Sequence, residues 1–164
     1  RELNSTVSGD GPQAEFKRPE SVLVVIYTKD GDALLLQRVR PARPEFWQSV
    51  TGSLHWSEQV PLDAARRELH EETGIQMETG WHDWQHTFRF PVLPQYRSRY
   101  PPGCTGNIEH VFSLEIPSRQ TIRINPREHS DSRWVSLSEA VSAVWSWTNR
   151  AALDALRDGR YPKG

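Results

Sequence analysis

The sequence predicts a mixed α/β fold in which a mixed β-sheet lies between helical layers. Three observations support this fold: an apolar, β-branched run near the N-terminus, a helical pattern of apolar residues in the middle of the chain, and a clear alternation of apolar and polar residues in the second half. The expected order is strands, one helix, further strands and C-terminal helices. That order favours helices on both faces of one sheet.

The first half of the chain contains three expected strands. Ser21–Thr28 is rich in β-branched residues and almost entirely apolar, as a strand covered on both faces should be. A turn at 29–32 leads to a returning strand at Ala33–Arg38. Two prolines then force an irregular loop, and Phe46–Thr51 is expected to form a short strand that ends at Gly52.

A helix is expected at Pro61–Thr73, because Pro61 suits its first turn and Gly74 suits its end. Apolar or small residues recur at helical spacing along it, and we expect them to share one buried face: Leu62, Ala65, Leu69 and Thr73. The sequence therefore predicts that this helix packs against the sheet.

The second half of the chain predicts further strands and two helices. The expected strands are Trp81–Phe90, Asn107–Ile116, Gln120–Ile124 and Arg133–Val135, with a proline-broken stretch after the first. Ser136, with Glu139 three residues later, resembles a capping box that opens a short helix. Asn149–Arg157 is the last expected helix and stops at Gly159.

Length and hydrophobicity limit the organisation of the chain. Its 164 residues are 36% hydrophobic, which suits a single compact domain. Residues 1–15 are polar and predict a flexible N-terminal tail, so the domain is expected to cover residues 16–164. No apolar run approaches the ~20 residues that span a bilayer, and no membrane partner is expected.

Charge and cysteine content exclude further classes. The net charge is −1 and the basic residues are scattered, so no nucleic-acid partner is expected. The single cysteine, Cys104, allows no internal disulfide, and the first residues lack the apolar stretch of a signal peptide. We therefore expect a cytoplasmic protein. The sequence gives no indication of its oligomeric state.

Three glutamates on the expected helix suggest a cation site. Glu68, Glu71 and Glu72 stand at i, i+3 and i+4, so they project from one side. At ~6 Å and an effective dielectric of ~20, each like-charged pair costs about 2.8 kcal/mol, and roughly 0.7 kcal/mol in bulk water. A partly buried cluster therefore needs a counter-charge, and Mg²⁺ prefers carboxylate oxygens and co-binds phosphates. The alternative is a solvated helix face on which Arg67 pairs with Glu71.

The segment 52–75 resembles the Nudix box, in which a glycine and a glutamate precede Arg-Glu-apolar-any-Glu-Glu-any-Gly-apolar. Residues 67–75 match the second half in full, and Gly52 and Glu58 match in type and spacing. Eight residues, one more than in the family pattern, separate Glu58 from the arginine, and Val60 replaces the usual capping Ser or Thr. The resemblance implies a Nudix-type α/β/α sandwich with a mixed β-sheet.

The resemblance also implies roles for the residues of the box. Glu68 and Glu72 would ligate the metal, while Glu71 and Glu72 are the candidate catalytic carboxylates. Arg67 and Glu58 belong to the same candidate catalytic set: Arg67 would orient the carboxylates through Glu58, although the extra residue leaves the position of Glu58 open. The implied cofactor is Mg²⁺, with Mn²⁺ as a substitute.

Two residues outside the helix complete the implied centre. In this family a later loop usually supplies another carboxylate, and Glu128 is the candidate metal ligand here, or an ordinary loop acid. Thr51 stands where the family often places a backbone carbonyl near the metal, and it is a candidate for substrate binding. The sequence leaves open whether Glu128 or a glutamate of the box accepts the proton of the attacking water.

Segments outside the box are similar to the Nudix subgroup of dihydroneopterin triphosphate pyrophosphohydrolases: FKRPESVLVVIY, LLLQR, PEFWQSVTGS, RSRYPPG and SWTNR. This resemblance implies release of pyrophosphate from a pterin triphosphate, a step toward folate. Lys17 and Arg38 would bind phosphate oxygens. The expected contacts to the ring are Phe90, Pro91, Val92, Leu93, Ser146 and Trp147, any of which could instead serve packing.

Three functions remain open at this stage. The first is hydrolysis of the pterin triphosphate. The second is Nudix hydrolysis of another diphosphate, such as a common nucleotide, a damaged nucleotide or a dinucleoside polyphosphate. The third is a Nudix-like module that binds a ligand without turnover, against which the intact glutamates argue, because a pure binder has no need of their repulsion.

Overall fold

The computed structural model describes residues 15–40 and 46–161. The expected N-terminal tail, residues 1–15, lies outside the described residues except for Glu15, and the two prolines expected in the loop, Pro41 and Pro44, also lie outside them. None of the described helices is long and apolar enough to cross a membrane.

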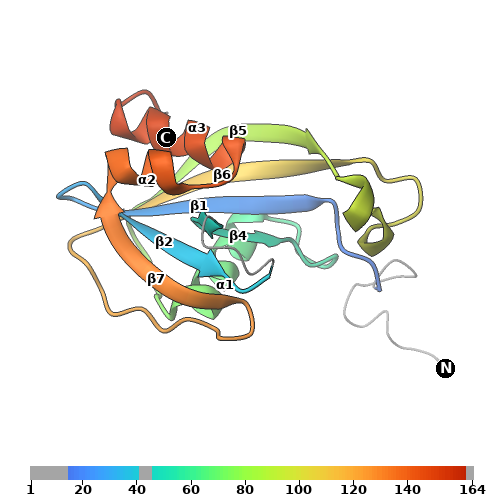
Figure 1. The fold of residues 1–164 in the computed structure, drawn as a ribbon, viewed down its shortest axis with the longest axis horizontal. Coiled ribbons are helices and arrows are strands. Elements are labelled where there is room, and N and C mark those ends of the chain that lie inside the picture. The colour runs from blue at the N-terminus through green and yellow to red at the C-terminus, as the bar shows by residue number, and fades with distance from the viewer. Residues whose placement is uncertain (1–14, 41–45, 162–164) are drawn as a thin grey trace.

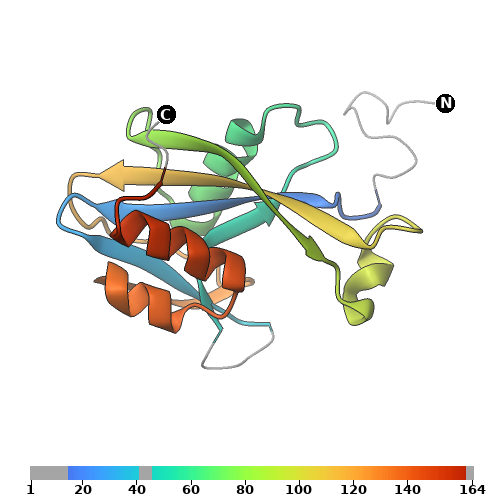
Figure 2. The same ribbon diagram turned by 90° about the horizontal axis from the view of Figure 1, so that it is seen from above.

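The described strands form one mixed sheet in the order β3-β2-β1-β6-β5, with β4 paired to β1 and β7 paired to β2. The strands are β1 (Glu20–Thr28), β2 (Asp32–Arg38), β3 (Trp47–Gln48), β4 (Val50–Ser53), β5 (Trp81–Pro91), β6 (Gly106–Ile116) and β7 (His129–Ser136). The helix α1 (Pro61–Thr73) covers one face, and α2 (Leu137–Ala143) and α3 (Trp147–Arg157) cover the other (Figures 1 and 2). The predicted α/β/α arrangement is confirmed.

The central strand, β1, is buried because helices cover both of its faces. Val22 and Val24 pack with Leu69 of α1, whereas Leu23 and Leu153 belong to the apolar cluster under α2 and α3. A fully buried side chain of this size contributes about 2 kcal/mol to stability. The continuous apolar pattern of Ser21–Thr28 thus correctly predicted a strand with two covered faces.

Two strands share one edge of β1. At its C-terminal end β1 pairs with β2 through Tyr27↔Ala33, and at its N-terminal half it pairs with β4 from Ser21↔Ser53 to Val24↔Val50. Along its other edge β1 runs parallel to β6 over its whole length. Because β2 and β4 meet β1 at different ends, they diverge in front of α1 (Figure 1).

Two expected strands differ in the structure. The segment Gln120–Ile124 is not a strand: Ile122 and Ile124 pack against the core beside α1, which explains their alternation without any strand pairing. The expected strand Phe46–Thr51 is divided into β3 and β4 at Ser49, whose backbone N–H donates to Asn149 Oδ1 at 2.8 Å.

The helix ends follow the predicted capping chemistry. Gly74 has φ 79° and its N–H donates to the His70 carbonyl at 2.9 Å, whereas Val60 gives α1 no side-chain cap. Ser136 and Glu139 form the predicted capping box of α2. The last helix begins two residues earlier than expected, at Trp147, because Ser146 caps it. The proline-broken stretch contains a short 3₁₀ helix, η2 (Pro94–Arg99).

Candidate active site

Arg67 of α1 organises the acidic residues around it. Its Nε and one terminal nitrogen donate to the two carboxylate oxygens of Glu58 at 2.9 and 3.0 Å. Its other terminal nitrogen donates to Glu68 at 3.1 Å and to Glu71 at 3.3 Å. The first terminal nitrogen also donates to the carbonyl of Ser53 in β4 at 2.9 Å. A planar guanidinium suits this forked arrangement better than an ammonium would.

The loop at 54–60 keeps Glu58 within reach of Arg67 although it carries one residue more than the family pattern. Glu58 Oε1 accepts the backbone N–H of His55 at 2.7 Å. From the other side, Arg18 donates to the carbonyls of His55 and Glu58 at 2.8 and 2.7 Å. Burial alone would raise the pKa of Glu58, but the hydrogen bonds from Arg67 and His55 lower it. The extra residue is therefore absorbed by the loop.

Glu68 and Glu72 form a buried acidic pair on the sheet side of α1. They are 9% and 3% exposed, respectively, which is unusual for glutamate. Space for the Glu68 carboxylate exists because residue 52 is glycine: a Cβ at that position would lie 2.0 Å from Glu68 Cδ. A larger residue at position 52 would therefore displace the Glu68 carboxylate from between α1 and β4.

The negative charges of Glu68 and Glu72 are unfavourable where the two residues lie. Burial raises the pKa of Glu68, and burial together with the charge of Glu68 raises the pKa of Glu72 well above its ordinary value. The two carboxyl groups also share a hydrogen bond. Glu72 Oε1 is buried without a hydrogen-bond partner among the described residues, and the imidazole Nε2 of His129 lies 3.9 Å from it.

The other predicted acids lie near this pair but are exposed. Glu71 projects to solvent, where Arg67 contacts it. Glu128 lies in the loop before β7, where its carbonyl accepts the N–H of Val39, and its charge contributes to the raised pKa of Glu72. Within the described residues no three acidic, His or Cys side chains converge as a preformed metal cage. The oxygen-rich donors and the partnerless Glu72 oxygen nevertheless fit a hard divalent cation.

Lys17 and Arg38 belong to a basic region beside the acidic pair. The surrounding protein and the charges of Arg99 and Arg38 lower the pKa of Lys17, although the residue as a whole is exposed. Glu68 and Glu128 oppose this effect, which places positive and negative groups on adjoining surfaces. Such a basic region can contact the phosphates of a ligand whose metal is held by the acids.

Thr51 and Ser146 lie on the α3 side of the sheet. Thr51 pairs with Leu23 of β1, and its hydroxyl accepts the side-chain amide of Gln48 at 3.3 Å. Ser146 caps α3, and its oxygen lies 2.9 Å from the hydroxyl of Thr148. Helix capping therefore accounts for Ser146 independently of any ligand.

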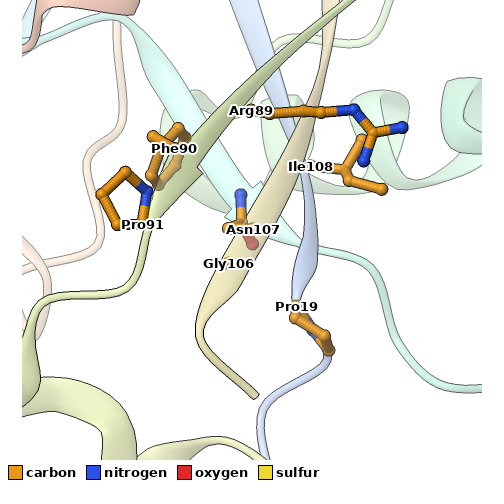
Figure 3. A pocket seen from close by; sticks show the side chains of 7 residues that line it. All are labelled: Pro19, Arg89, Phe90, Pro91, Gly106, Asn107 and Ile108. Carbon is orange, nitrogen blue, oxygen red and sulfur yellow. The ribbon is translucent and has the colours of Figure 1, made fainter.

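Residues 90–93, expected to contact the ring, lie at the end of β5. Figure 3 shows Phe90 and Pro91 at a surface groove of about 510 Å³ that Asn107 of β6 also lines. Val92 is buried, whereas Leu93 is 49% exposed. Because β6 and β1 lie between β5 and β4, about three strand spacings, roughly 14 Å, separate Phe90 from β4. The structure thus brings the acidic and basic residues together and sets Phe90 and its neighbours at the end of β5 apart from them.

Sequence reasoning missed several residues of this region. Arg18 fixes the backbone of the loop, and Gly52 makes room for Glu68. His129 is 2% exposed, and burial followed by the charge of Arg38 lowers its pKa to about 4, so it is a neutral neighbour of the acids. Glu109 of β6 is also buried, on the opposite face of the sheet from α1. Only Gly52 carried a signal, because it belongs to the Nudix box.

The sheet between two helical layers and the acidic helix define the class of protein. The NUDIX domain family matches residues 17–156, and the chain belongs to this family. The resemblance carried by the Nudix box and the predicted fold class are therefore confirmed.

Individual members of the family show which of its proteins this chain resembles. The dihydroneopterin triphosphate diphosphatase of Escherichia coli (strain K12) is 39% identical over 142 residues, which are 85% of this chain and 92% of that protein. The Haemophilus influenzae protein of the same name is 37% identical over 142 residues, 85% of this chain and 87% of its own. The solved structure of the E. coli dihydroneopterin triphosphate pyrophosphohydrolase matches with a TM-score of 0.78 and 37% identity, over 88% of this chain and 98% of that one. The predicted resemblance to this subgroup is confirmed.

Proposed function

We propose that this chain is an Mg²⁺-dependent hydrolase that converts dihydroneopterin triphosphate to dihydroneopterin monophosphate and pyrophosphate, a step toward folate. The observation that carries the proposal is the buried pair of Glu68 and Glu72 beside Arg67, in a chain 39% identical to a diphosphatase named for this substrate. A bound Mg²⁺ would offset charge on the polyphosphate and lower the pKa of a bound water.

The metal would be held by Glu68, Glu72 and Glu128. The partnerless oxygen of Glu72 and the mutual repulsion of the buried pair support this assignment. Arg67 and Glu58 would act as positioning residues, because Glu58 fixes Arg67 by paired hydrogen bonds and Arg67 in turn donates to Glu68 and Glu71. Mn²⁺ would substitute for Mg²⁺, since both accept carboxylate and phosphate oxygens.

The remaining residues would bind substrate or move a proton. Lys17 and Arg38 would bind phosphate oxygens, and Glu71, Glu72 or Glu128 would accept the proton of the attacking water. Thr51 would contribute near the metal. The ring would be contacted by Phe90, Pro91, Val92, Leu93 and Ser146. The roughly 14 Å between Phe90 and β4 suits a substrate whose ring and reacting phosphate are far apart.

A substrate panel tests the proposed reaction. Pyrophosphate release would be measured with Mg²⁺ on dihydroneopterin triphosphate, GTP, ATP, 8-oxo-dGTP and diadenosine tetraphosphate. We expect kcat/KM for the pterin to exceed every other value by at least about tenfold, a difference of about 1.4 kcal/mol in transition-state binding. If kcat/KM for common nucleotides equals that for the pterin triphosphate, the chain is instead a Nudix hydrolase of broader specificity. Tight pterin binding without turnover would assign a ligand-binding module.

Metal binding is measured separately from turnover. Binding of Mn²⁺ to the purified chain would be followed by electron paramagnetic resonance, with a non-hydrolysable polyphosphate present. Glu68→Gln is expected to weaken this binding, whereas Glu78→Gln is the matched control, because Glu78 follows α1 but its side chain is 88% exposed. Equal affinity in the wild type and Glu68→Gln would remove Glu68 from the metal site.

A further inference from the structure

Glu109 is a buried carboxyl group that the proposed chemistry does not use. It lies on β6, facing α3, and is 5% exposed. Its Oε1 has no hydrogen-bond partner among the described residues, and a hydrogen bond from Thr148 is the one polar side-chain contact that affects its pKa. Burying an ionisable group without partners is strongly unfavourable, so the position calls for a functional explanation.

Among the residues that the structure describes, no cation neutralises Glu109. In register with it lie Ser21 on β1 and Phe88 on β5, both uncharged. Burial raises the pKa of Glu109 to about 7, and Thr148 offsets only part of this effect. A ligand that donates hydrogen bonds would therefore provide the donors that the Glu109 carboxylate lacks within the protein.

Aromatic surface adjoins this carboxyl group. The rings of Phe88 and Trp147 meet edge to face with their centroids 5.5 Å apart, and Trp147 is 55% exposed. The groove seen in Figure 3 reaches Asn107, two residues from Glu109 on the same face of β6. Its volume of about 510 Å³ lies within the range of small-molecule sites. The groove is not lined by Glu109 itself, but it places a flat ring next to this carboxyl group and to the aromatic pair.

A row of residues connects Glu109 to the acidic helix. Ser53 of β4, Ser21 of β1 and Glu109 of β6 are paired in register across the sheet. Two strand spacings, about 10 Å, therefore separate the backbone at Glu109 from that at Ser53. The carbonyl of Ser53 accepts a hydrogen bond from Arg67. A ring bound at Glu109, on the α3 face, would therefore lie about 10 Å along the sheet from the strand whose Ser53 contacts α1.

We infer that Glu109 is a specificity-determining residue whose carboxylate accepts paired hydrogen bonds from a 2-amino-4-oxopyrimidine ring. The donors are the 2-amino group and the adjacent ring N–H, an edge that pterins share with guanine. Adenine presents an acceptor nitrogen beside its amino group, so the carboxylate would repel that edge. The inference rests on the proposed function in one respect, because it places the polyphosphate at α1.

Glu109→Gln tests this inference, because it keeps the shape of the side chain but removes one acceptor and the charge. Neopterin, which has the ring without phosphates, would be titrated against the full chain by fluorescence. We expect its Kd, and the KM for dihydroneopterin triphosphate, to rise about tenfold to hundredfold in the variant, as loss of hydrogen bonds to a charged group implies. The value of kcat is expected to change less than KM.

Two further variants make the test specific. Glu115→Gln is the matched control on the same strand and face, where Glu115 contacts the hydroxyl of Tyr27 at 3.1 Å, and it should leave Kd and KM unchanged. Glu109→Asp keeps the charge at a shorter reach and is expected to fall between the wild type and Glu109→Gln. It also provides the measurement if Glu109→Gln does not fold.

The outcomes separate the inference from the proposed function. If the wild type hydrolyses the pterin triphosphate and Glu109→Gln has the same KM, the inference is overturned and the function stands. If the wild type does not hydrolyse it but Glu109→Gln weakens neopterin binding, the ring site stands and the function falls. Neopterin binding that is equal in all variants, or undetectable at millimolar concentration in the wild type, counts against the ring site.

Discussion

The two faces of the sheet bury acid in different ways. On the α1 face, Glu68 and Glu72 lie together, with Arg67 and the exposed Glu128 nearby. On the α3 face, Glu109 has no ionic partner within the described part of the chain and lies beside a hydroxyl and an aromatic ring. Two like charges in one place are suited to a cation, whereas a single carboxylate in an uncharged site is suited to neutral hydrogen-bond donors. The comparison teaches that the neighbours of a buried glutamate decide which kind of ligand it would suit.

The largest expected effect is on the α1 face. Glu72→Gln should lower kcat on the order of 10³-fold, about 4 kcal/mol in activation free energy, because it removes a proposed metal ligand. The folded state should not lose stability, since a buried charge without a partner is also removed. Steady-state kinetics and thermal unfolding measure both quantities. Glu78→Gln is the control, and an unchanged kcat in Glu72→Gln would exclude Glu72 as a ligand.

On the α3 face the largest effect is a change in how stability depends on pH. The folded state holds the proton of Glu109 more tightly than the unfolded chain does, with a pKa of about 7 against an ordinary value of 4.5. This contribution is present below pH 4.5 and lost as the pH rises through about 7, up to about 3 kcal/mol. Glu109→Gln should therefore exceed the wild type in unfolding free energy at pH 8, with little difference near pH 4.5. Urea unfolding at both pH values checks this, and parallel stability curves would contradict it.

A smaller effect on the α1 face is expected from Arg67, which would hold the acidic residues in position but would not bind the metal. Arg67→Lys keeps the charge but loses the paired hydrogen bonds to Glu58, so kcat/KM should fall about tenfold to hundredfold. The neighbouring Arg66, whose closest ion pair is a 3.6 Å contact to the exposed Glu78, provides the control Arg66→Lys. Activity titrated against Mg²⁺ should show a raised metal requirement in Arg67→Lys alone. If the wild type and Arg67→Lys need the same Mg²⁺ concentration, Arg67 does not position the metal ligands.

The smallest expected effect concerns the hydroxyl beside Glu109. Thr148→Val removes its hydrogen bond to Glu109 and should lower the unfolding free energy at pH 8 by about 1 kcal/mol. Thr148→Ser keeps the hydroxyl and should behave like the wild type. If both variants lose the same stability, packing rather than the hydrogen bond explains the position.

The acidic helix could be predicted from the sequence because its geometry is local. Spacings of three and four residues place Glu68 and Glu72 on one side of any α-helix, whatever packs against it. Pro61 and Gly74 marked its ends for equally local reasons. The position of Glu58 could not be predicted, since it depends on how the loop is fixed by Arg18 from outside the box. The roles of these residues in catalysis stay predictions until they are measured.

Glu109 could not be found in this way. Asn107, Glu109 and Ser113 alternate with apolar residues in β6, which is the usual pattern of a strand with one solvated face. Tertiary contacts turn this surface pattern into a buried polar site, because Thr148 of α3 hydrogen-bonds to Glu109 and Trp147 packs on Phe88 of β5. The expected strand Gln120–Ile124 failed for a related reason, because alternation reports burial and not the presence of a pairing strand.

The loop at 54–60 is fixed at its backbone by Arg18 and at Glu58 by Arg67, while Val60 at its end is 51% exposed. Between such anchors a chain can gain or lose a residue without shifting the reactive groups, because loop closure changes little with length. The loop at 54–60 is therefore a position at which residues can be inserted, for instance a short recognition peptide. Such an insertion should leave Arg67 and Glu58 in place.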